Sequence, residues 1–184
     1  MYSILIGIPT SGNVSAKLVN WMMSFDRMGH DVEFMVSEFR PLPANRNLIR
    51  DTFLSKGFDY LVQLDDDIVL EKDFLKIIDN DKDICSAAVY TIKENGIIPL
   101  ALNEVSDGEY LPVVKEGLFQ CDAVGGGCVC IKRKVVEAVK WHYLNDEKVK
   151  SEDLYFCKQA RENGFEVWYD ANIRALHYTI TPIG

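Results

Sequence analysis

The sequence of 184 residues contains no long uncharged apolar run, so no transmembrane segment is expected. Its apolar start, MYSILIGIPT, has neither a basic segment nor a small-residue cleavage site, which favours a first strand over a signal peptide. Basic residues are also few, with 20 Lys and Arg against 28 Asp and Glu, and they form no stripe. Because binding to a nucleic-acid backbone needs clustered positive charge, no nucleic-acid partner is expected.

The sequence also lacks the cysteine spacings of a zinc site. Its five cysteines are odd in number, and Cys128 and Cys130 have no CxxC or HxxxH partner. Most cysteines lie in apolar runs, which is typical of buried, reduced thiols in a cytoplasmic protein. With 48% hydrophobic and 26% charged residues, the chain has the composition of one soluble globular domain.

The first half of the chain alternates between strand and helix patterns. Strands are predicted at 2–9, 31–37, 59–65 and 83–90, and helices at 14–28, 44–56 and around 74–78. Asn13 is the candidate cap of the first helix, and Gly57 ends the second. This alternation predicts right-handed βαβ units and a parallel sheet covered on both faces, with ligands at the carboxyl ends of the strands.

The second half is less regular. Residues 95–118 are predicted to form irregular strands and turns, and a strand at 128–133 follows the run Gly125-Gly126-Gly127. A helix at 134–141, a polar loop at 142–150, a helix at 151–162, a strand at 165–169 and an extended tail with His177 complete the prediction. No repeat or low-complexity segment divides the chain.

Three adjacent acids, Asp65-Asp66-Asp67, follow the third predicted strand. Like charges at a buried strand end are costly unless a cation or hydrogen bonds compensate. In an extended chain, Asp65 and Asp67 would point the same way and offer two hard oxygen ligands, which suit Mg²⁺ or Mn²⁺. A solvated acidic turn is the alternative interpretation.

Three mechanisms use such acids. An EF-hand is excluded, because Leu70 and Lys76 stand where its loop needs Gly and Glu. A phosphatase of the haloacid dehalogenase type stays open, with Asp65 as nucleophile and Asp67 as acid and base. However, two strands precede its motif, and no later G-D-x-x-x-D follows. In the third, a divalent ion stabilises the leaving diphosphate of a nucleotide donor.

Several motifs, taken in order, make the chain resemble a GT-A glycosyltransferase close to family 2, over nearly all of its length. The stretches that carry the resemblance are Ile8-Pro9-Thr10, Asn45-Arg46-Asn47, LVQLDDD at 61–67, Val124-Gly125-Gly126-Gly127 with CVCIKR, Ser151-Glu152-Asp153 and His177. The resemblance implies a single α/β domain of GT-A type, 1–184. Its Rossmann-like, mostly parallel central sheet would be flanked by helices, with a small antiparallel portion on the acceptor side. Residues 1–90 would form the nucleotide-binding half and 91–184 the acceptor and catalytic half.

The resemblance also implies the donor site. Pro9, Thr10, Arg46, Asp65 and Asp66 would line the nucleotide side, with Arg46 facing the diphosphate. Gly126 and Gly127 would lie beside the donor sugar. Asp65, Asp67 and His177 would hold Mn²⁺ or Mg²⁺.

On the acceptor side, Asp153 is expected to be the base of an inverting transfer, with Glu152 contacting the acceptor or orienting Asp153. The helix N-terminus is expected to favour the ionised form of Asp153. The expected donor is a UDP- or GDP-sugar, and the acceptor a glycan, lipid-linked or protein hydroxyl. A non-catalytic nucleotide-sugar binding domain is the remaining alternative.

Overall fold

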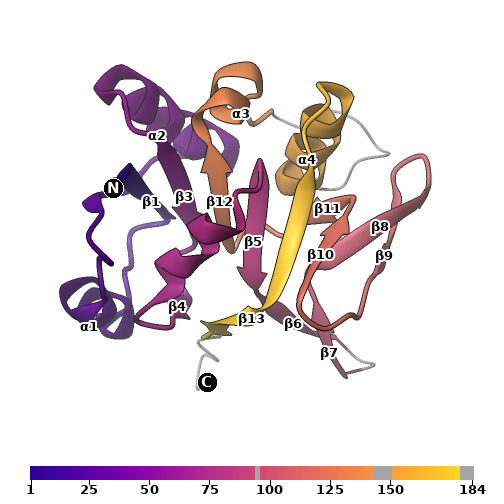
Figure 1. Ribbon diagram of the computed structural model, residues 1–184, viewed down its shortest axis with the longest axis horizontal. Coiled ribbons are helices and arrows are strands. Elements are labelled where there is room, and N and C mark those ends of the chain that lie inside the picture. Colours follow the sequence, from indigo (N-terminus) through magenta and orange to yellow (C-terminus); the bar gives the residue numbers. More distant parts are fainter. Residues whose placement is uncertain (94–95, 143–150, 179–184) are drawn as a thin grey trace.

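A mixed eight-stranded sheet forms the centre of the protein in the computed structural model, which describes residues 1–93, 96–142 and 151–178 (Figure 1). Its strand order is β10-β13-β5-β12-β3-β1-β2, and β4 pairs with the far end of β13. Strands β1, β2, β3, β5 and β13 run in one direction, and β4, β10 and β12 run against them. The bounds are β1 Ser3–Thr10, β2 Asp31–Glu38, β3 Tyr60–Leu64, β4 Ile68–Leu70, β5 Ile84–Ala88, β10 Leu118–Cys121, β12 Cys128–Lys132 and β13 Val167–His177.

Two small antiparallel sheets lie at one side, as expected for the second half of the chain (Figure 1). One is the hairpin of β6 Tyr90–Lys93 and β7 Gly96–Pro99. The other joins β8 Ala101–Ser106 to β9 Glu109–Pro112 and to β11 Ala123–Val124.

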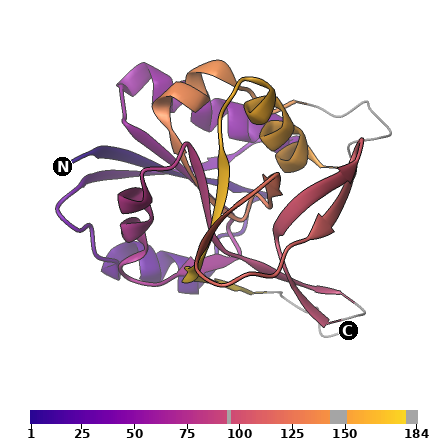
Figure 2. The ribbon, with the colours of Figure 1, turned by 45° about the vertical axis from the view of Figure 1, so that its right-hand side comes forward.

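Helices cover both faces of the central sheet (Figure 2). On one face lie α1 Ala16–Ser24 and the 3₁₀ helix η1 Phe74–Asn80, and on the other α2 Leu42–Lys56, α3 Arg133–Ala138 and α4 Glu152–Glu162. The alternation of strand side chains separates the two cores: Ile4 and Ile6 of β1 pack under α1, whereas Leu5 packs under α2. Burial of each such side chain contributes about 1.5–3 kcal/mol.

The first helix is shorter than the predicted 14–28, and its cap is Ser15 and not Asn13. The Ser15 hydroxyl accepts a hydrogen bond from the Leu18 amide (3.1 Å). At the other end Phe25 is extended, and its ring stacks on Trp21 in the core at 5.1 Å between centroids. The chain therefore leaves the helix at the point where doing so buries an aromatic ring.

Two later elements also differ from the prediction. The helix predicted at 134–141 ends at Ala138, because Nε of the buried Arg50 of α2 donates hydrogen bonds to the carbonyl groups of Val136 and Val139. The strand predicted at 165–169 continues as β13 to His177, where it pairs with β4. The predicted polar loop 142–150 lies, except for its first residue, outside the described residues.

Candidate functional site

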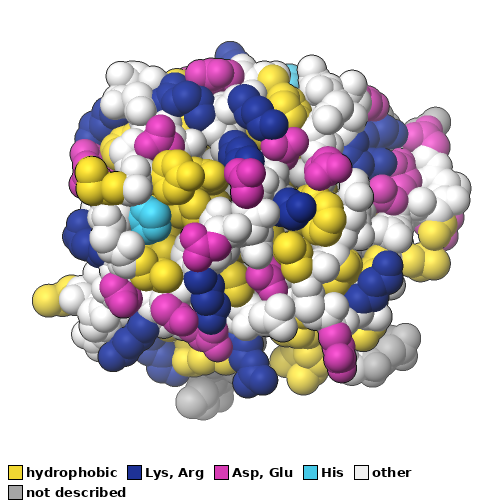
Figure 3. All heavy atoms as spheres, in the orientation of Figure 1, with side chains coloured by type: hydrophobic (Ala, Val, Ile, Leu, Met, Phe, Trp, Pro, Cys, Tyr) yellow, Lys and Arg dark blue, Asp and Glu magenta, His cyan; other side chains and the backbone are white. Residues whose placement is uncertain are grey.

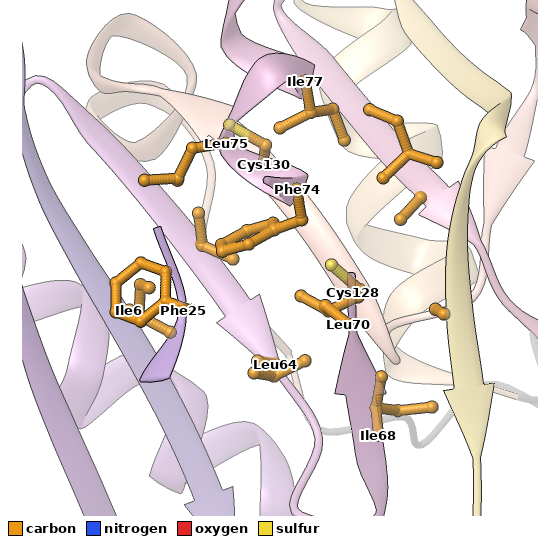
Figure 4. Close-up of a cluster of buried hydrophobic side chains, with 14 of the residues drawn as sticks. Ile6, Phe25, Leu64, Ile68, Leu70, Phe74, Leu75, Ile77, Cys128 and Cys130 are labelled. Atoms are coloured by element: carbon orange, nitrogen blue, oxygen red, sulfur yellow. The ribbon is translucent and has the colours of Figure 1, made fainter. Parts of the chain in front are cut away.

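The three acids form a turn at the carboxyl end of β3. The Ile68 amide donates to the Asp65 carbonyl (3.1 Å), and the Asp65 amide donates to the Gly127 carbonyl (2.9 Å). Leu64 and Ile68, on either side of the turn, point into the same buried cluster (Figure 4). The chain is therefore not extended at the acids, contrary to the prediction, because burial of these two flanking side chains makes it turn.

A pocket of about 510 Å³ lies in front of this turn, at the carboxyl ends of β1, β2 and β3. Five predicted residues line it: Pro9, Thr10, Asp65, Asp66 and Asp67. Its size is in the range of small-molecule sites, and its place is the one where parallel α/β sheets bind ligands.

The other side of this pocket is the loop from β2 into α2, which was not predicted from the sequence. Phe39, Arg40, Pro41 and Leu42 line the pocket, together with Asn45. The Asn45 amide donates to the Ser37 carbonyl (2.7 Å), so it holds the start of α2 against the end of β2. The signal was present: if β1 and β2 pair in parallel, the residues after β2 must lie beside those after β1.

Asp67 lies beside His177 of β13. The Nε2 atom of His177 is 3.0 Å from Oδ2 of Asp67, and its Nδ1–H donates to the Tyr90 carbonyl (3.1 Å). Burial alone would lower the pKa of His177, but the bonds to Tyr90 and Asp67 raise it above its ordinary value. The bond to Tyr90 also fixes the imidazole so that Nε2 faces Asp67.

This pair fits a divalent metal ion. Neighbouring ligand atoms around Mg²⁺ or Mn²⁺, with bonds of about 2.1 Å, lie about 3 Å apart, and the two donor atoms here are 3.0 Å apart. A hydrogen bond from the second ring nitrogen to a carbonyl is also the usual support of a ligating histidine. No cluster of three or more His, Cys, Asp or Glu converges on one point in the described parts of the chain. The pair would therefore need ligand oxygens and water to complete the coordination, as Mg²⁺ sites commonly do.

Asp65 has a different partner. Its Oδ1 accepts a hydrogen bond of 2.9 Å from Nη2 of Arg46, a residue that is only 1% exposed. Burial raises the pKa of Asp65 and Arg46 opposes that rise, while repulsion from Asp67 adds to it. Arg46 does not line the donor-side pocket, so the lining of this pocket does not support the predicted contact between Arg46 and a diphosphate.

Asp153 lies in the first turn of α4. Its Oδ2 accepts from the Gly126 amide (2.9 Å) and its Oδ1 from its neighbour Leu154 (2.8 Å). Burial raises the pKa of Asp153, and repulsion from Glu152 adds to the rise. The helix N-terminus was expected to favour the ionised form of Asp153, but the loss of hydration on burial has the larger effect on its pKa. A raised pKa suits a carboxylate that must take up a proton.

Glu152 and the glycine run meet Arg46 as well. Oε1 of Glu152 is 3.4 Å from Nε of Arg46. A Cβ atom on Gly126 would lie 2.6 Å from Nη2 of Arg46, and one on Gly127 would lie 3.1 Å from Val89. Side chains of the protein itself therefore approach these glycines closely, and contact with a donor sugar stays a prediction.

No protein-family model and no curated protein matches the sequence. The solved structures that match its fold include the following two. A197 from STIV has a TM-score of 0.68 over 97% of this chain and 86% of that chain, with 21% identity. GalNAc-T7 in complex with UDP, GalNAc and Mn²⁺ also has a TM-score of 0.68, over 97% of this chain and 44% of that chain, with 14% identity.

The chain has the GT-A fold. At these identities the likeness extends to the fold alone, and the chain spans less than half the length of the GalNAc-T7 chain. No helix in the described ranges is long and apolar enough to cross a membrane. On the face of the GT-A domain seen in Figure 3, basic and acidic side chains are interspersed.

Proposed function

We propose that the protein is a metal-dependent glycosyltransferase, which moves a sugar from a nucleotide-diphosphate donor to a hydroxyl acceptor. The observation that carries the proposal is that Asp67 lines the 510 Å³ pocket on the carboxyl side of the sheet and lies 3.0 Å from His177. The GT-A fold and the UDP and Mn²⁺ bound to GalNAc-T7 support it, and they make UDP-sugars with Mn²⁺ the first donors to test.

In this reaction the loop 39–42 and the end of β1 bind the nucleotide, and Asp67 and His177 hold the ion. Mn²⁺ or Mg²⁺, when bound, stabilises the negative charge that develops on the leaving diphosphate. Asp153 takes the proton of the acceptor hydroxyl while the hydroxyl oxygen forms a bond to the anomeric carbon of the donor sugar. The bond from this carbon to the diphosphate breaks on the opposite side, so the configuration at the anomeric carbon is inverted. Because burial raises the pKa of Asp153, this carboxylate is a stronger base than an exposed aspartate.

The phosphatase alternative is less well supported. It needs Asp65 as a nucleophile, but Oδ1 of Asp65 is engaged by Arg46 at 2.9 Å. A phosphatase would bind aluminium fluoride or beryllium fluoride at Asp65 and form a covalent phosphate there. A binding domain without activity would tolerate replacement of Asp153 at no cost to its function.

Calorimetric titration of UDP, GDP and their sugar conjugates, with Mn²⁺ and with EDTA, tests the donor site. We expect one nucleotide to bind only with metal, and binding to be lost in Asp67→Ala. Asp73→Ala is the matched control, because Asp73 is exposed and pairs with Lys76 away from the pocket. If no nucleotide binds in any condition, or if Asp67→Ala and Asp153→Ala leave transfer rates unchanged, the proposal is refuted.

A further inference from the structure

The guanidinium of Arg46 joins three separate segments of the chain. Nη2 donates to Asp65 (2.9 Å) and Nη1 to the Gln63 side chain (3.4 Å), both at the end of β3. Nη1 also donates to the Gly126 carbonyl (3.5 Å), and Nε lies 3.4 Å from Glu152 of α4. Arg46 thus touches the acid turn, the glycine run and the acceptor-side helix at once.

The peptide groups of Gly126 extend this contact to Asp153. The Gly126 carbonyl accepts from Arg46, and its amide donates to Oδ2 of Asp153 at 2.9 Å. Arg46 and Asp153 also line one small cavity of about 10 Å³ together with Gln63 and Gly126. Arg46 therefore faces the side of the fold that carries the proposed base.

Charge explains why an arginine is buried here. Burial alone would lower the pKa of Arg46, but Asp65, Glu152 and Asp153 raise it above its ordinary value. A planar, permanently charged guanidinium has donors on three separate nitrogens and can reach several segments at once, whereas all three donors of a lysine lie on one nitrogen. One cation among three carboxylates holds them close together without full mutual repulsion.

A different arginine faces the pocket. Arg40 is exposed and lies in the loop before α2, and it is the basic residue among the described residues that line the 510 Å³ pocket. An exposed guanidinium can bond two phosphate oxygens at once.

We propose that Arg46 is a positioning residue, which fixes Asp153 and Glu152 against the acid turn, and that Arg40 is the arginine that contacts the donor's diphosphate. This inference rests on the proposed function. It assigns different roles to two arginines that lie six positions apart. Loss of Arg40 should weaken diphosphate binding, whereas loss of Arg46 should lower turnover.

The test compares Arg40→Met, Arg46→Met and Arg46→Lys. Calorimetry with Mn²⁺ would use UDP and uridine, and GDP and guanosine, and turnover would be followed as release of UDP or GDP from the matching sugar conjugate. We expect Arg40→Met to weaken diphosphate binding about tenfold and to leave nucleoside binding within about twofold. We expect Arg46→Met to keep diphosphate affinity within about threefold and to lower kcat at least a hundredfold, and Arg46→Lys to recover part of kcat because it restores the charge.

The inference is overturned if Arg46→Met weakens diphosphate binding as much as Arg40→Met, or if it leaves kcat unchanged. If Arg46→Met does not fold, Arg46→Lys is compared with Arg40→Met by the same criteria. If the wild type binds neither UDP nor GDP, the proposed function fails. The link through Arg46 is then judged by a double-mutant cycle on thermal unfolding.

That cycle combines Arg46→Lys with Glu152→Gln, and its control combines Arg46→Lys with Asp73→Asn, a remote surface site. We expect the shifts in unfolding temperature to be non-additive in the first cycle and additive in the control. Additive shifts in both cycles would overturn the positioning role.

Discussion

Replacement of Gly126 by alanine is the sharpest test of the packing around Arg46. An alanine Cβ would lie 2.6 Å from Nη2 and 3.1 Å from Cζ of Arg46, closer than side-chain atoms pack. The guanidinium must then move by several tenths of an ångström, but it is 1% exposed and bonded to Asp65 at 2.9 Å. The new Cβ atom therefore clashes with the guanidinium of Arg46, which can move only if its ion pair with Asp65 is disturbed.

The expected cost follows from that competition. Overpacking a buried site costs about 1–3 kcal/mol, and we expect the upper part of this range because the group that must move is charged and hydrogen-bonded. For a domain of this size, about 2–3 kcal/mol lowers the unfolding temperature by roughly 4–12 °C. Thermal unfolding followed by circular dichroism measures the shift. Because the Gly126 amide donates to Asp153, we also expect Gly126→Ala to lower transfer activity and to leave diphosphate affinity unchanged.

Gly127→Ala is the matched control. Its Cβ would meet only apolar atoms, at 3.1 Å from Val89 and 3.5 Å from Ile68, so we expect a cost below about 1 kcal/mol. Adding Arg46→Met to Gly126→Ala should remove most of the clash, because methionine has no atom in the place of Nη2. The reasoning is refuted if Gly126→Ala destabilises no more than Gly127→Ala, or if its cost is the same with and without Arg46.

Three further predictions concern the base, the metal and the first helix. Burial, followed by repulsion from Glu152, raises the pKa of Asp153 in the folded protein. The ionised carboxylate therefore destabilises the fold at pH values above this pKa, and it has no such effect below the pKa of Asp153 in the unfolded chain. Asp153→Asn should therefore unfold at a higher temperature at pH 8, with a smaller gain at pH 4, while transfer falls about 10²–10⁴-fold; an equal gain at both pH values would contradict this. His177→Ala should weaken Mn²⁺ binding in the presence of UDP at least tenfold by calorimetry, and unchanged affinity would remove His177 from the site. Ser15→Ala should cost about 0.5–2 kcal/mol in urea unfolding, whereas Asn13→Ala should cost less than about 0.5 kcal/mol; the reverse order would make Asn13 the cap.

The sequence predicted the strands of the first half well, because buried parallel strands are short apolar runs bounded by turn residues. The runs at 2–9 and 31–37 became β1 and β2 almost residue for residue. The long β13 was not predicted past residue 169. Its outer half pairs with β4, some hundred residues earlier, and no local pattern records such a pairing.

The positions of candidate site residues could be predicted at strand ends but not where they depend on packing. The acids and Pro9 and Thr10 line the pocket, and strand ends are visible in the sequence; their roles stay predictions. Arg46 was assigned to the diphosphate because it is a cation near a motif. Its burial depends on Asp65 and Glu152, which lie far away in the chain, and a single sequence does not show that they converge.

The three acids after β3 line one pocket, but two of them have different partners, although they are only two residues apart. Asp65 turns inward to Arg46, and Asp67 lies beside His177 at the rim of the pocket. The chain turns between Leu64 and Ile68, so it is not the extended strand that would send both carboxylates to one face. Arg46 also contacts Glu152 and the Gly126 carbonyl, and the Gly126 amide donates to Asp153, so a chain of contacts runs from the acid turn to the proposed base. The acid turn is therefore in contact with both the proposed donor site and, through Arg46 and Gly126, the proposed base.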